Sequence, residues 1–472
     1  MSSSLRSRLQ SIADMGFSII GLPNQLERKL APAEIIKLCH LLLSGRGEAS
    51  GAAISREILR SYKKLNEPEK TDFFELLLSE FSADQDKTVN AASAYVSDPN
   101  HHNLNKLLSA SQPSRLNLIM RLNQAPNATR DLVEMRADLL LRLREVPELR
   151  FVDREFVHLF TSWFSRGFLD LRSIDWNTPA AILEKLIKYE AVHGMAGWED
   201  LRKRINPEDR RIFAFFHPRL GDEPLIFVEV ALMDEVPSTI DSVLGSNDSE
   251  LATLDIKRAN TAVFYSISNC QKGLRGIPLG NFLIKHVVEE LRTEYPNLKT
   301  FVTLSPVPSF RKWAAAALRG DSDLQLPPAA RKALEMASGD SWQEDAQTLR
   351  DIGETLMPMA AWYLCNGTSE RQTLDPVARF HLGNGARLDR INWAADKSQN
   401  GMNGSFGIMV NYRYRLDEIE SNHEMFANKG MVVASPAVSR AAKSFDSILD
   451  KQKSAAKSTS ADTSSIESAG AT

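Results

Sequence analysis

The chain has 472 residues, of which 43% are hydrophobic and 25% are charged, and its formal net charge is −3 at pH 7. A domain holds about 150 residues, so this length predicts two or three domains. The charge balance argues against a general nucleic-acid-binding protein, because such proteins carry a basic excess that neutralises phosphates.

Cysteine content and hydropathy exclude further classes. The three cysteines lie far apart and belong to no CxxC or Cys/His cluster, which argues against a disulfide framework and a metal site and fits a reducing compartment. No apolar run approaches the roughly 20 residues of a membrane span. The N-terminus lacks a signal-peptide cleavage pattern, and Ala469–Thr472 contains no peroxisomal tripeptide. The expected location is the cytoplasm.

The first part of the chain is predicted to be helical. From Ala31 to about Tyr189, apolar residues recur at three- and four-residue spacing, for example in Ile35–Leu42 and Leu132–Leu143. Nothing before Arg210 shows the alternation of a strand. We therefore expect an all-helical bundle over residues 1–190, with short connections that favour antiparallel neighbours.

The pattern changes at Arg210. Two β-branched and aromatic runs, Arg211–His217 and Leu225–Met233, flank a Gly/Pro/Asp turn and predict an antiparallel hairpin. A strand over Thr261–Ser268, a glycine-bearing loop, a helix over residues 281–295 and a strand over Lys299–Leu304 follow. This strand–helix–strand segment predicts a right-handed parallel crossover.

The remaining chain completes an α+β prediction. Residues 324–375 are expected to be mostly helical, and 376–431 to be mixed. The whole of 191–450 is therefore predicted to be a mixed α/β domain. From Lys451 the chain is rich in Ser, Ala and Thr, which predicts a disordered tail over 451–472.

Three segments contain residues suited to chemistry. The first is the loop that carries Gly273, Gly276 and Gly280 ahead of a helix, where backbone N–H groups can approach a diphosphate. A tight turn that only joins strand to helix explains it equally well. The layout resembles the coenzyme A site of GNAT-type acetyltransferases, although their usual glycine spacing is absent. A Rossmann site fits poorly, because G-x-G-x-x-G is missing.

The second segment is Thr303–Pro308, in which Ser305 ends a strand and is followed by Pro306. This pattern is typical of a helix N-cap, and that structural explanation is favoured on the fragment alone. The same geometry also provides a place for a carboxylate or an oxyanion at a helix N-terminus. The chain lacks the Gly-x-Ser-x-Gly elbow of acyl-serine hydrolases.

The third segment, Phe380–Tyr414, concentrates amide, aromatic and glycine residues without an amphipathic period. Such a stretch can form surface turns, but its Trp and Tyr residues favour a lined cavity. His381 alone is more typical of a structural histidine than of a catalytic one.

Together these segments resemble the malonyl-CoA decarboxylase family. The matching motifs, in chain order, are FYSIS (264–268), GLRGIPLGNFLIK (273–285), LSPVPSFRKW (304–313), FHLGNGARLDRINWAAD (380–396) and GSFGIMVNYRY (404–414). The resemblance implies an N-terminal helical domain used in self-association, giving a homo-oligomer such as a dimer or tetramer. It also implies a C-terminal acetyltransferase-like domain that binds the thioester.

The resemblance also assigns roles to residues. It implies that Ser305 is the catalytic proton acceptor, His381 the catalytic proton donor and Tyr414 a further active-site residue. The implied malonyl-CoA-binding loop consists of Arg275, Gly276, Ile277, Pro278, Leu279, Gly280 and Asn281. Some family members have an acidic residue where this chain has Pro278, so a carboxylate there is not essential if the activity is kept. Asn411 is a candidate for contacting or orienting the substrate.

The implied reaction converts malonyl-CoA to acetyl-CoA and CO2. The thioester accepts the electrons released with CO2, so no metal or other cofactor is expected. Two alternatives remain. An acyl- or acetyltransferase with the same fold would release free CoA, and a non-catalytic CoA-binding assembly protein would bind without turnover. Neither a nucleic-acid partner nor a membrane partner is expected.

Overall fold

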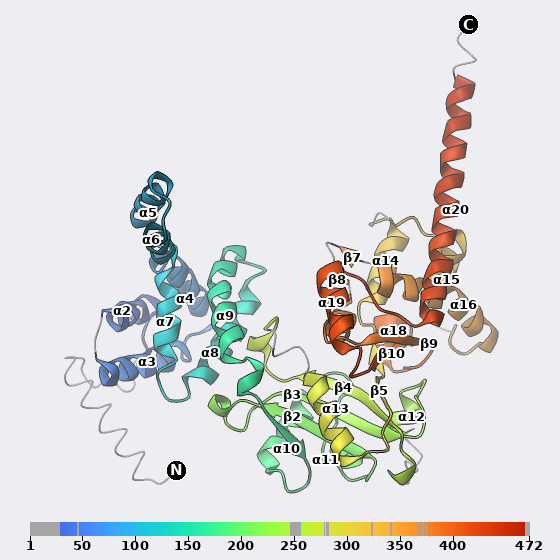
Figure 1. Cartoon of the computed structure of the whole chain (residues 1–472), viewed down its shortest axis with the longest axis horizontal. Helices are drawn as coiled ribbons and strands as arrows, with labels where there is room; N and C mark the ends of the chain where they lie inside the picture. Colours follow the sequence, from blue (N-terminus) through green and yellow to red (C-terminus); the bar gives the residue numbers. More distant parts are fainter. Residues whose placement is uncertain are drawn as a thin grey trace. The chain divides into compact units, whose positions relative to one another are not determined.

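The computed structural model describes residues 29–44, 47–245, 256–277, 279, 283–321, 324–339, 342–366, 368–369, 372–373 and 375–467. The chain forms two compact units (Figure 1). The helical unit comprises Met1–Leu171, Phe215–Ile226 and Asn269–Leu279. The mixed unit comprises Arg172–Ala214, Phe227–Ser268 and Gly280–Thr472.

The helical unit confirms the prediction for the first part of the chain. Its helices are α2 (Pro32–Leu43), α3 (Glu48–Tyr62), α4 (Glu67–Glu80), α5 (Gln85–Ser97), α6 (His101–Ser111), α7 (Ser114–Leu122), α8 (Ala128–Arg142) and α9 (Arg150–Trp163). The apolar faces meet in an aromatic core that contains Phe73, Phe74, Phe156 and Phe160, each at most 1% exposed. Since apolar burial is the main stabilising term in folding, these faces hold the bundle together.

The sequence analysis did not predict one strand. Asp170–Ile174 forms β1, at the edge of the sheet beside β2 (Arg210–Phe216). Only Ile174 of this strand is buried, so no alternation of apolar and polar residues marks it. An edge strand is held mainly by backbone hydrogen bonds, which any sequence can supply. The statement that no strand precedes Arg210 is therefore wrong.

The sheet has eight strands. Its order is β1-β2-β3-β4-β5-β10-β6, with β9 paired to β10; the further strands are β3 (Pro224–Met233), β4 (Thr261–Asn269), β5 (Thr300–Thr303), β6 (Ser305–Pro306), β9 (Arg387–Asn392) and β10 (Met409–Tyr414). Strands β4 and β5 are parallel and are joined through α13 (Leu283–Glu294), as predicted. Strand β10 is antiparallel to β5, β6 and β9.

The prediction for Ser305 as a helix N-cap is wrong. Ser305 lies in β6, where it pairs with Val410 of β10, and helix α14 (Phe310–Arg319) begins only after Ser309. Pro306 is tolerated in this two-residue edge strand because a missing N–H at an edge costs no ladder bond. Pairing with β10 therefore overrides the local preference of the Ser-Pro sequence.

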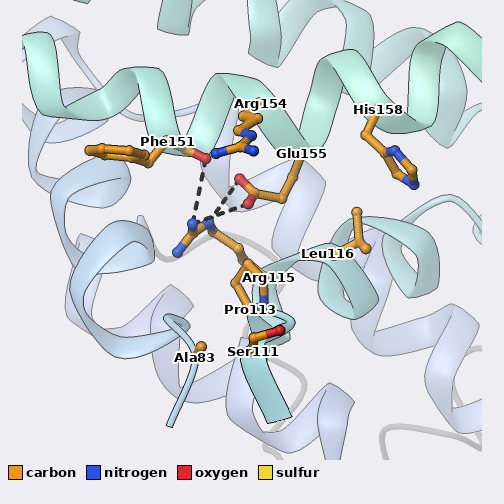
Figure 2. Close-up of a pocket in the computed structure, with 9 residues that line it drawn as sticks. All are labelled: Ala83, Ser111, Pro113, Arg115, Leu116, Phe151, Arg154, Glu155 and His158. Atoms are coloured by element: carbon orange, nitrogen blue, oxygen red, sulfur yellow. Dashed lines mark hydrogen bonds and ion pairs between the residues drawn. The ribbon is translucent and has the colours of Figure 1, made fainter. Parts of the chain in front are cut away.

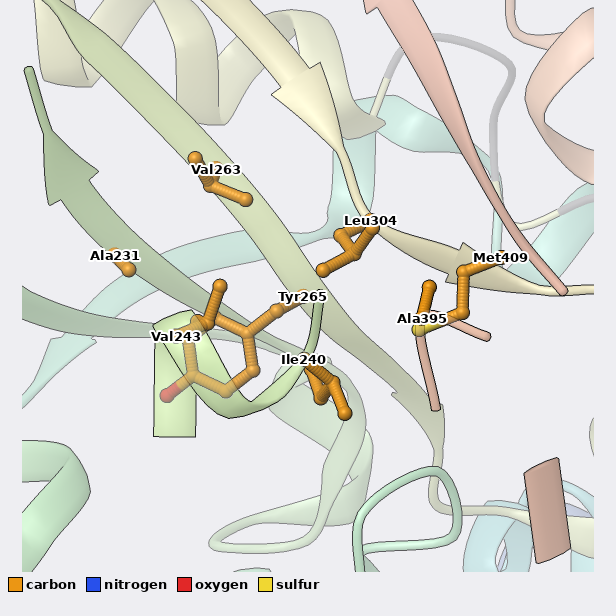
Figure 3. Packing of buried hydrophobic residues seen from close by; sticks show 8 residues of the cluster. All are labelled: Ala231, Ile240, Val243, Val263, Tyr265, Leu304, Ala395 and Met409. Atoms are coloured by element: carbon orange, nitrogen blue, oxygen red, sulfur yellow. The ribbon is translucent and has the colours of Figure 1, made fainter. Parts of the chain in front are cut away.

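A buried cluster stabilises one side of the sheet (Figure 3). Its eight members are Ala231, Ile240, Val243, Val263, Tyr265, Leu304, Ala395 and Met409, each at most 4% exposed. Met409 is the first residue of β10. Because side chains alternate along a strand, Val410, Tyr412 and Tyr414 point to the opposite face of β10. Strand β10 therefore contributes Met409 to this buried cluster on one face and places Val410, Tyr412 and Tyr414 on the other.

Helices cover the rest of the mixed unit. They are α10 (Ala180–Tyr189), α11 (Trp198–Ile205), α12 (Asp241–Leu244), α15 (Pro328–Ala337), α16 (Ala346–Asn366), α17 (Pro376–Gly383), α18 (Gln399–Ser405), α19 (Ile419–Lys429) and α20 (Pro436–Glu467), with a small hairpin of β7 (Thr368–Ser369) and β8 (Gln372–Thr373). Their presence over 328–366 and 376–429 confirms the helical and mixed predictions for these segments.

The predicted tail differs from the structure. Helix α20 continues through residue 467, so the segment predicted to be disordered is helical over 451–467. Composition suggested disorder because few apolar residues are present. However, no Gly or Pro interrupts this segment, and extending an existing helix avoids the cost of nucleation. Residues 468–472 lie outside the described part of the chain.

Candidate active site

Helix α17 positions His381. Asp375 is the N-cap, and its carboxylate accepts hydrogen bonds from the backbone N–H groups of Val377 (2.9 Å) and Ala378 (3.1 Å). Pro376 occupies the first helical position, where its fixed φ suits the helix. The same Asp375 carboxylate accepts a bond from the Ser309 N–H at 3.1 Å, which ties α17 to the start of α14. His381 lies in the last turn and is 2% exposed.

The imidazole of His381 joins two hydroxyl groups that the sequence places far apart. Its Nε2 lies 3.1 Å from the Ser305 Oγ, and its Nδ1 lies 2.8 Å from the Tyr414 hydroxyl. The ring also stacks on Tyr412, with 4.6 Å between ring centroids. The structure therefore brings together the three residues that the resemblance singled out as catalytic.

The Ser305 hydroxyl has a second partner, Thr303, which the sequence analysis missed. Ser305 donates to the Thr303 Oγ1 at 2.9 Å, and the same oxygen accepts the Tyr412 N–H at 3.1 Å. Thr303 is fully buried. Its position two residues before Ser305 was the available signal, because residues i and i+2 of a strand share a face.

The hydrogen-bond network favours one tautomer of His381. In the described part of the chain, the Tyr414 hydroxyl has His381 as its only hydrogen-bond partner, and the phenol is 2% exposed. A buried O–H requires an acceptor, so Tyr414 donates to Nδ1. The ring proton then resides on Nε2 and points to the Ser305 Oγ. Ser305 in turn donates its own hydrogen to the Thr303 Oγ1.

Burial sets the charge state of the site. Desolvation lowers the pKa of His381 to about 3, since an imidazolium loses its hydration here and no carboxylate among the described residues offsets this loss. Desolvation also raises the pKa of Tyr414 above its usual range. At neutral pH both rings are therefore uncharged.

The Asn411 side chain links β10 to β9 and β5 by hydrogen bonds. Its Oδ1 accepts from the Arg390 Nε and the Asn392 Nδ2, both at 2.9 Å, and its Nδ2 donates to the Thr303 backbone oxygen at 2.8 Å. Asn411 is fully buried. The amide is thus already used by protein groups, which favours the orienting role over direct contact with a substrate.

Only part of the Arg275–Asn281 loop is described. Arg275 and Gly276 are exposed, whereas Ile277 and Leu279 are buried. Gly276 has φ +78°, a conformation that residues with a side chain rarely adopt. Pro278, Gly280 and Asn281 lie outside the described residues. The diphosphate-binding role of this loop stays a prediction.

A separate cavity of about 430 Å³ lies in the helical unit (Figure 2). Its lining includes Phe151, Arg154 and His158 from α9. The buried Arg115 donates to both carboxylate oxygens of Glu155 in its wall, at 2.9 and 3.1 Å. This ion pair fixes α7 against α9. No sequence motif pointed to this cavity.

Among the described residues, no group of three or more His, Cys, Asp or Glu side chains could hold a metal ion. No helix in that part of the chain is long and apolar enough to cross a bilayer.

Comparison with known proteins identifies the family. The family model "Malonyl-CoA decarboxylase C-terminal domain" matches residues 167–458, and "Malonyl-CoA decarboxylase N-terminal domain" matches residues 81–164. The mitochondrial malonyl-CoA decarboxylase of Rattus norvegicus is 36% identical over 356 residues, which cover 71% of this chain and 72% of that protein. The protein of the same name from Anser anser anser is 35% identical over 343 residues, 68% of each chain.

Solved structures agree with the sequence comparison. The crystal structure of malonyl-CoA decarboxylase from Rhodopseudomonas palustris is 49% identical, with a TM-score of 0.82, and covers 87% of this chain and 99% of its own. The corresponding structure from Agrobacterium vitis is 50% identical, with a TM-score of 0.80, and covers 86% and 99%. The chain therefore belongs to the malonyl-CoA decarboxylase family.

Proposed function

We propose that this protein converts malonyl-CoA to acetyl-CoA and CO2, with Ser305, His381 and Tyr414 as its catalytic residues. Family membership supports the reaction. The observation that carries the proposal is the buried line of hydrogen bonds from Tyr414 through His381 to Ser305. Apolar side chains would fill the same buried space without the free-energy cost of burying polar groups. The buried hydrogen bonds therefore support a functional role for these residues.

The reaction requires one bond to break and one to form. The bond between the α-carbon and the carboxylate breaks, and its electron pair moves into the thioester to give an enolate while CO2 leaves. The α-carbon then takes one proton. Because the thioester carbonyl accepts the electron pair, the proposed reaction requires no cofactor. The protein must stabilise the enolate more strongly than the substrate.

A neutral imidazole suits this task. An imidazolium would form an ion pair with the malonyl carboxylate and stabilise the substrate, which would raise the barrier. A neutral Nε2–H instead donates a hydrogen bond as negative charge develops on the thioester oxygen. The low pKa of His381, about 3, keeps the ring in this form.

Ser305 is proposed to transfer the proton. Its hydroxyl lies between the His381 Nε2 and the Thr303 Oγ1. It can turn from Thr303 and give its hydrogen to the enolate carbon while the Nε2 proton stays on the imidazole. Water returns a proton to Ser305 and leaves as hydroxide, which carries the negative charge of the malonyl carboxylate. Tyr414 keeps the ring proton on Nε2 by donating to Nδ1.

The Arg275–Asn281 loop is proposed to bind the coenzyme A part of the substrate. Its glycines permit a close approach of backbone N–H groups to a diphosphate, and Gly276 has the positive φ that such loops use. Pro278 stands where some family members have an acidic residue, so the proposal requires no carboxylate at this point.

The proposal also includes assembly and location. We infer a homo-oligomer, dimer or tetramer, formed through the helical domain over 1–190, with catalysis in 191–450, in the cytoplasm. Light scattering coupled to size-exclusion chromatography measures the oligomer. A monomeric mass at micromolar concentration would contradict self-association.

The decisive experiment follows the thioester. Purified protein is incubated with malonyl-CoA, and the products are identified by mass spectrometry. We expect acetyl-CoA and CO2. Free CoA would indicate an acyltransferase, and unchanged malonyl-CoA with measurable binding would indicate a CoA-binding protein without turnover.

Matched variants test the residues. Ser305→Ala is expected to lower kcat by roughly two orders of magnitude or more, the typical contribution of positioned acid–base catalysis. The control is His101→Gln, which changes an exposed histidine at the first residue of α6 and should leave kcat unaltered. A fully active Ser305→Ala protein would remove Ser305 from the mechanism.

A further inference from the structure

Tyr412 of β10 covers one face of the His381 imidazole. The two rings are nearly parallel, with 4.6 Å between their centroids and 22° between their planes. Phe380 and Tyr414 meet the same imidazole at steep interplanar angles instead, 79° and 67°. Tyr412 is fully buried, so its ring provides a flat contact from which water is excluded.

This flat contact supplies what the two hydrogen bonds of His381 leave undetermined. The bonds of Nε2 with Ser305 and of Nδ1 with Tyr414 define a line across the ring. The imidazole can still tilt about this line, and a tilt turns the Nε2–H direction away from the Ser305 Oγ and weakens a bond that depends on alignment. Contact with the Tyr412 ring removes this freedom, because a close-packed interior leaves no space for the tilt.

The backbone of the sheet holds Tyr412 in place. Strand β9 has a β-bulge at this point, since its pairing to β10 skips Asp389 just where Tyr412 begins the next pair. Such bulges increase the local twist and change the direction of neighbouring side chains. The Tyr412 N–H also donates to the Thr303 Oγ1 at 3.1 Å, the same oxygen that accepts the Ser305 hydroxyl. The backbone that carries the Tyr412 ring is thus bonded to the residue that orients the serine.

The hydroxyl of Tyr412 does not account for this arrangement. It is buried and has no hydrogen-bond partner among the described residues. An unpaired buried hydroxyl costs free energy and fixes no neighbour. The ring of Tyr412 is therefore the part that acts on His381.

We infer that Tyr412 is a positioning residue for the decarboxylation: its ring fixes the plane of the His381 imidazole, so that Nε2–H keeps its direction toward Ser305. The inference rests on the proposed function of His381 and Ser305, and it adds the residue that orients the histidine. Catalytic groups act only when they are aligned, and a misplacement of about 1 Å can lower a rate roughly 100-fold.

The first test is Tyr412→Leu, which fills part of the space but removes the flat ring. We expect kcat to fall roughly 10- to 100-fold while the KM for malonyl-CoA stays within about twofold, the pattern of an interaction that matters only in the transition state. Tyr412→Phe returns the ring without the hydroxyl and should restore kcat to within about twofold of the wild-type value. Failure of phenylalanine to restore kcat would assign the effect to the hydroxyl and overturn the inference.

The matched control is Tyr265→Leu. Tyr265 is also a buried tyrosine of the sheet, 2% exposed, but it lies in the cluster that contains Met409 (Figure 3), on the other face of β10 from Tyr412. Both leucine variants should lower the melting temperature, whereas only Tyr412→Leu should lower kcat. Equal losses of kcat in the two variants would reduce Tyr412 to a packing residue.

Crystal structures of the variants give a readout that does not depend on turnover. The distance between the His381 Nε2 and the Ser305 Oγ is 3.1 Å, and it should exceed roughly 3.5 Å in Tyr412→Leu while the phenylalanine variant and the Tyr265→Leu control keep the bond. If Tyr412→Leu fails to fold, Tyr412→Met replaces it, because its flexible side chain fills the space without a flat face. An unaltered distance in the folded variant would overturn the inference. If the wild-type protein does not decarboxylate malonyl-CoA, the proposed reaction fails, and this distance still decides whether Tyr412 orients His381.

Discussion

His381 is buried and uncharged between two hydroxyl groups, and this state makes the stability of the protein depend on pH. The folded-state pKa is about 3, whereas an unfolded histidine titrates near 6.5. Below pH 6.5 the unfolded chain therefore binds a proton that the folded protein refuses. The contribution of His381 to stability is fully present above pH 6.5 and is lost as the pH falls toward 3.

The perturbation that isolates this effect is His381→Gln, which removes the titrating ring. Linkage predicts that the wild-type protein loses about 2 kcal/mol more than the variant between pH 7 and pH 5. His193 and His217, whose pKa values burial also lowers, titrate in both proteins and cancel in the comparison.

Urea unfolding followed by tryptophan fluorescence measures the difference. Six of the seven tryptophans, all except Trp163, belong to the mixed unit that contains His381, so the signal reports mainly on that unit. The free energies of unfolding of the two proteins should converge or cross as the pH falls. Parallel curves from pH 7 to pH 5 would refute the claim that His381 is buried in its neutral form.

Three further predictions concern catalysis. Tyr414→Phe removes the donor to Nδ1 and is expected to lower kcat about 10- to 100-fold with little change in KM; steady-state kinetics test this, and an unchanged kcat would exclude Tyr414 from fixing the tautomer. Thr303→Val keeps the shape of the side chain but removes the acceptor for Ser305, so kcat should fall about tenfold and recover in Thr303→Ser; failure of the serine to restore it would exclude the hydroxyl as the cause. The pH profile of kcat/KM should show no His381-dependent ionisation between about pH 5 and 8, and a step that disappears in His381→Gln would contradict the neutral form.

Much of the fold could be predicted from the sequence because its signals are local. The runs at 211–217, 225–233 and 261–268 are apolar, β-branched and aromatic, and each became a strand at nearly the predicted bounds. Buried strands need such residues on both faces. By contrast, β1 is exposed and lacks this signature, since its pairing rests on backbone groups.

Local sequence patterns could not predict how the residues of the candidate site meet. Ser305 and His381 are 76 positions apart, and no periodicity predicts that they meet. Their candidacy came from resemblance to a family, and the fold supplied their hydrogen bond. The Ser-Pro sequence suggested a helix N-cap because a local pattern contains no information about β10. That strand is remote in the chain, yet it pairs with Ser305.

Strands β5 and β6 keep one register against β10, although a break separates them. Phe301 and Val302 face Tyr414 and Arg413, and Ser305 and Pro306 face Val410 and Met409, so no residue is gained or lost across the gap. The length of the segment from Phe301 to Ser305 is therefore constrained in addition to the identity of its residues. A deletion of one residue there would turn the Ser305 side chain to the other face of the sheet, away from His381. Such a deletion would therefore abolish activity even if Thr303 and Ser305 were both kept.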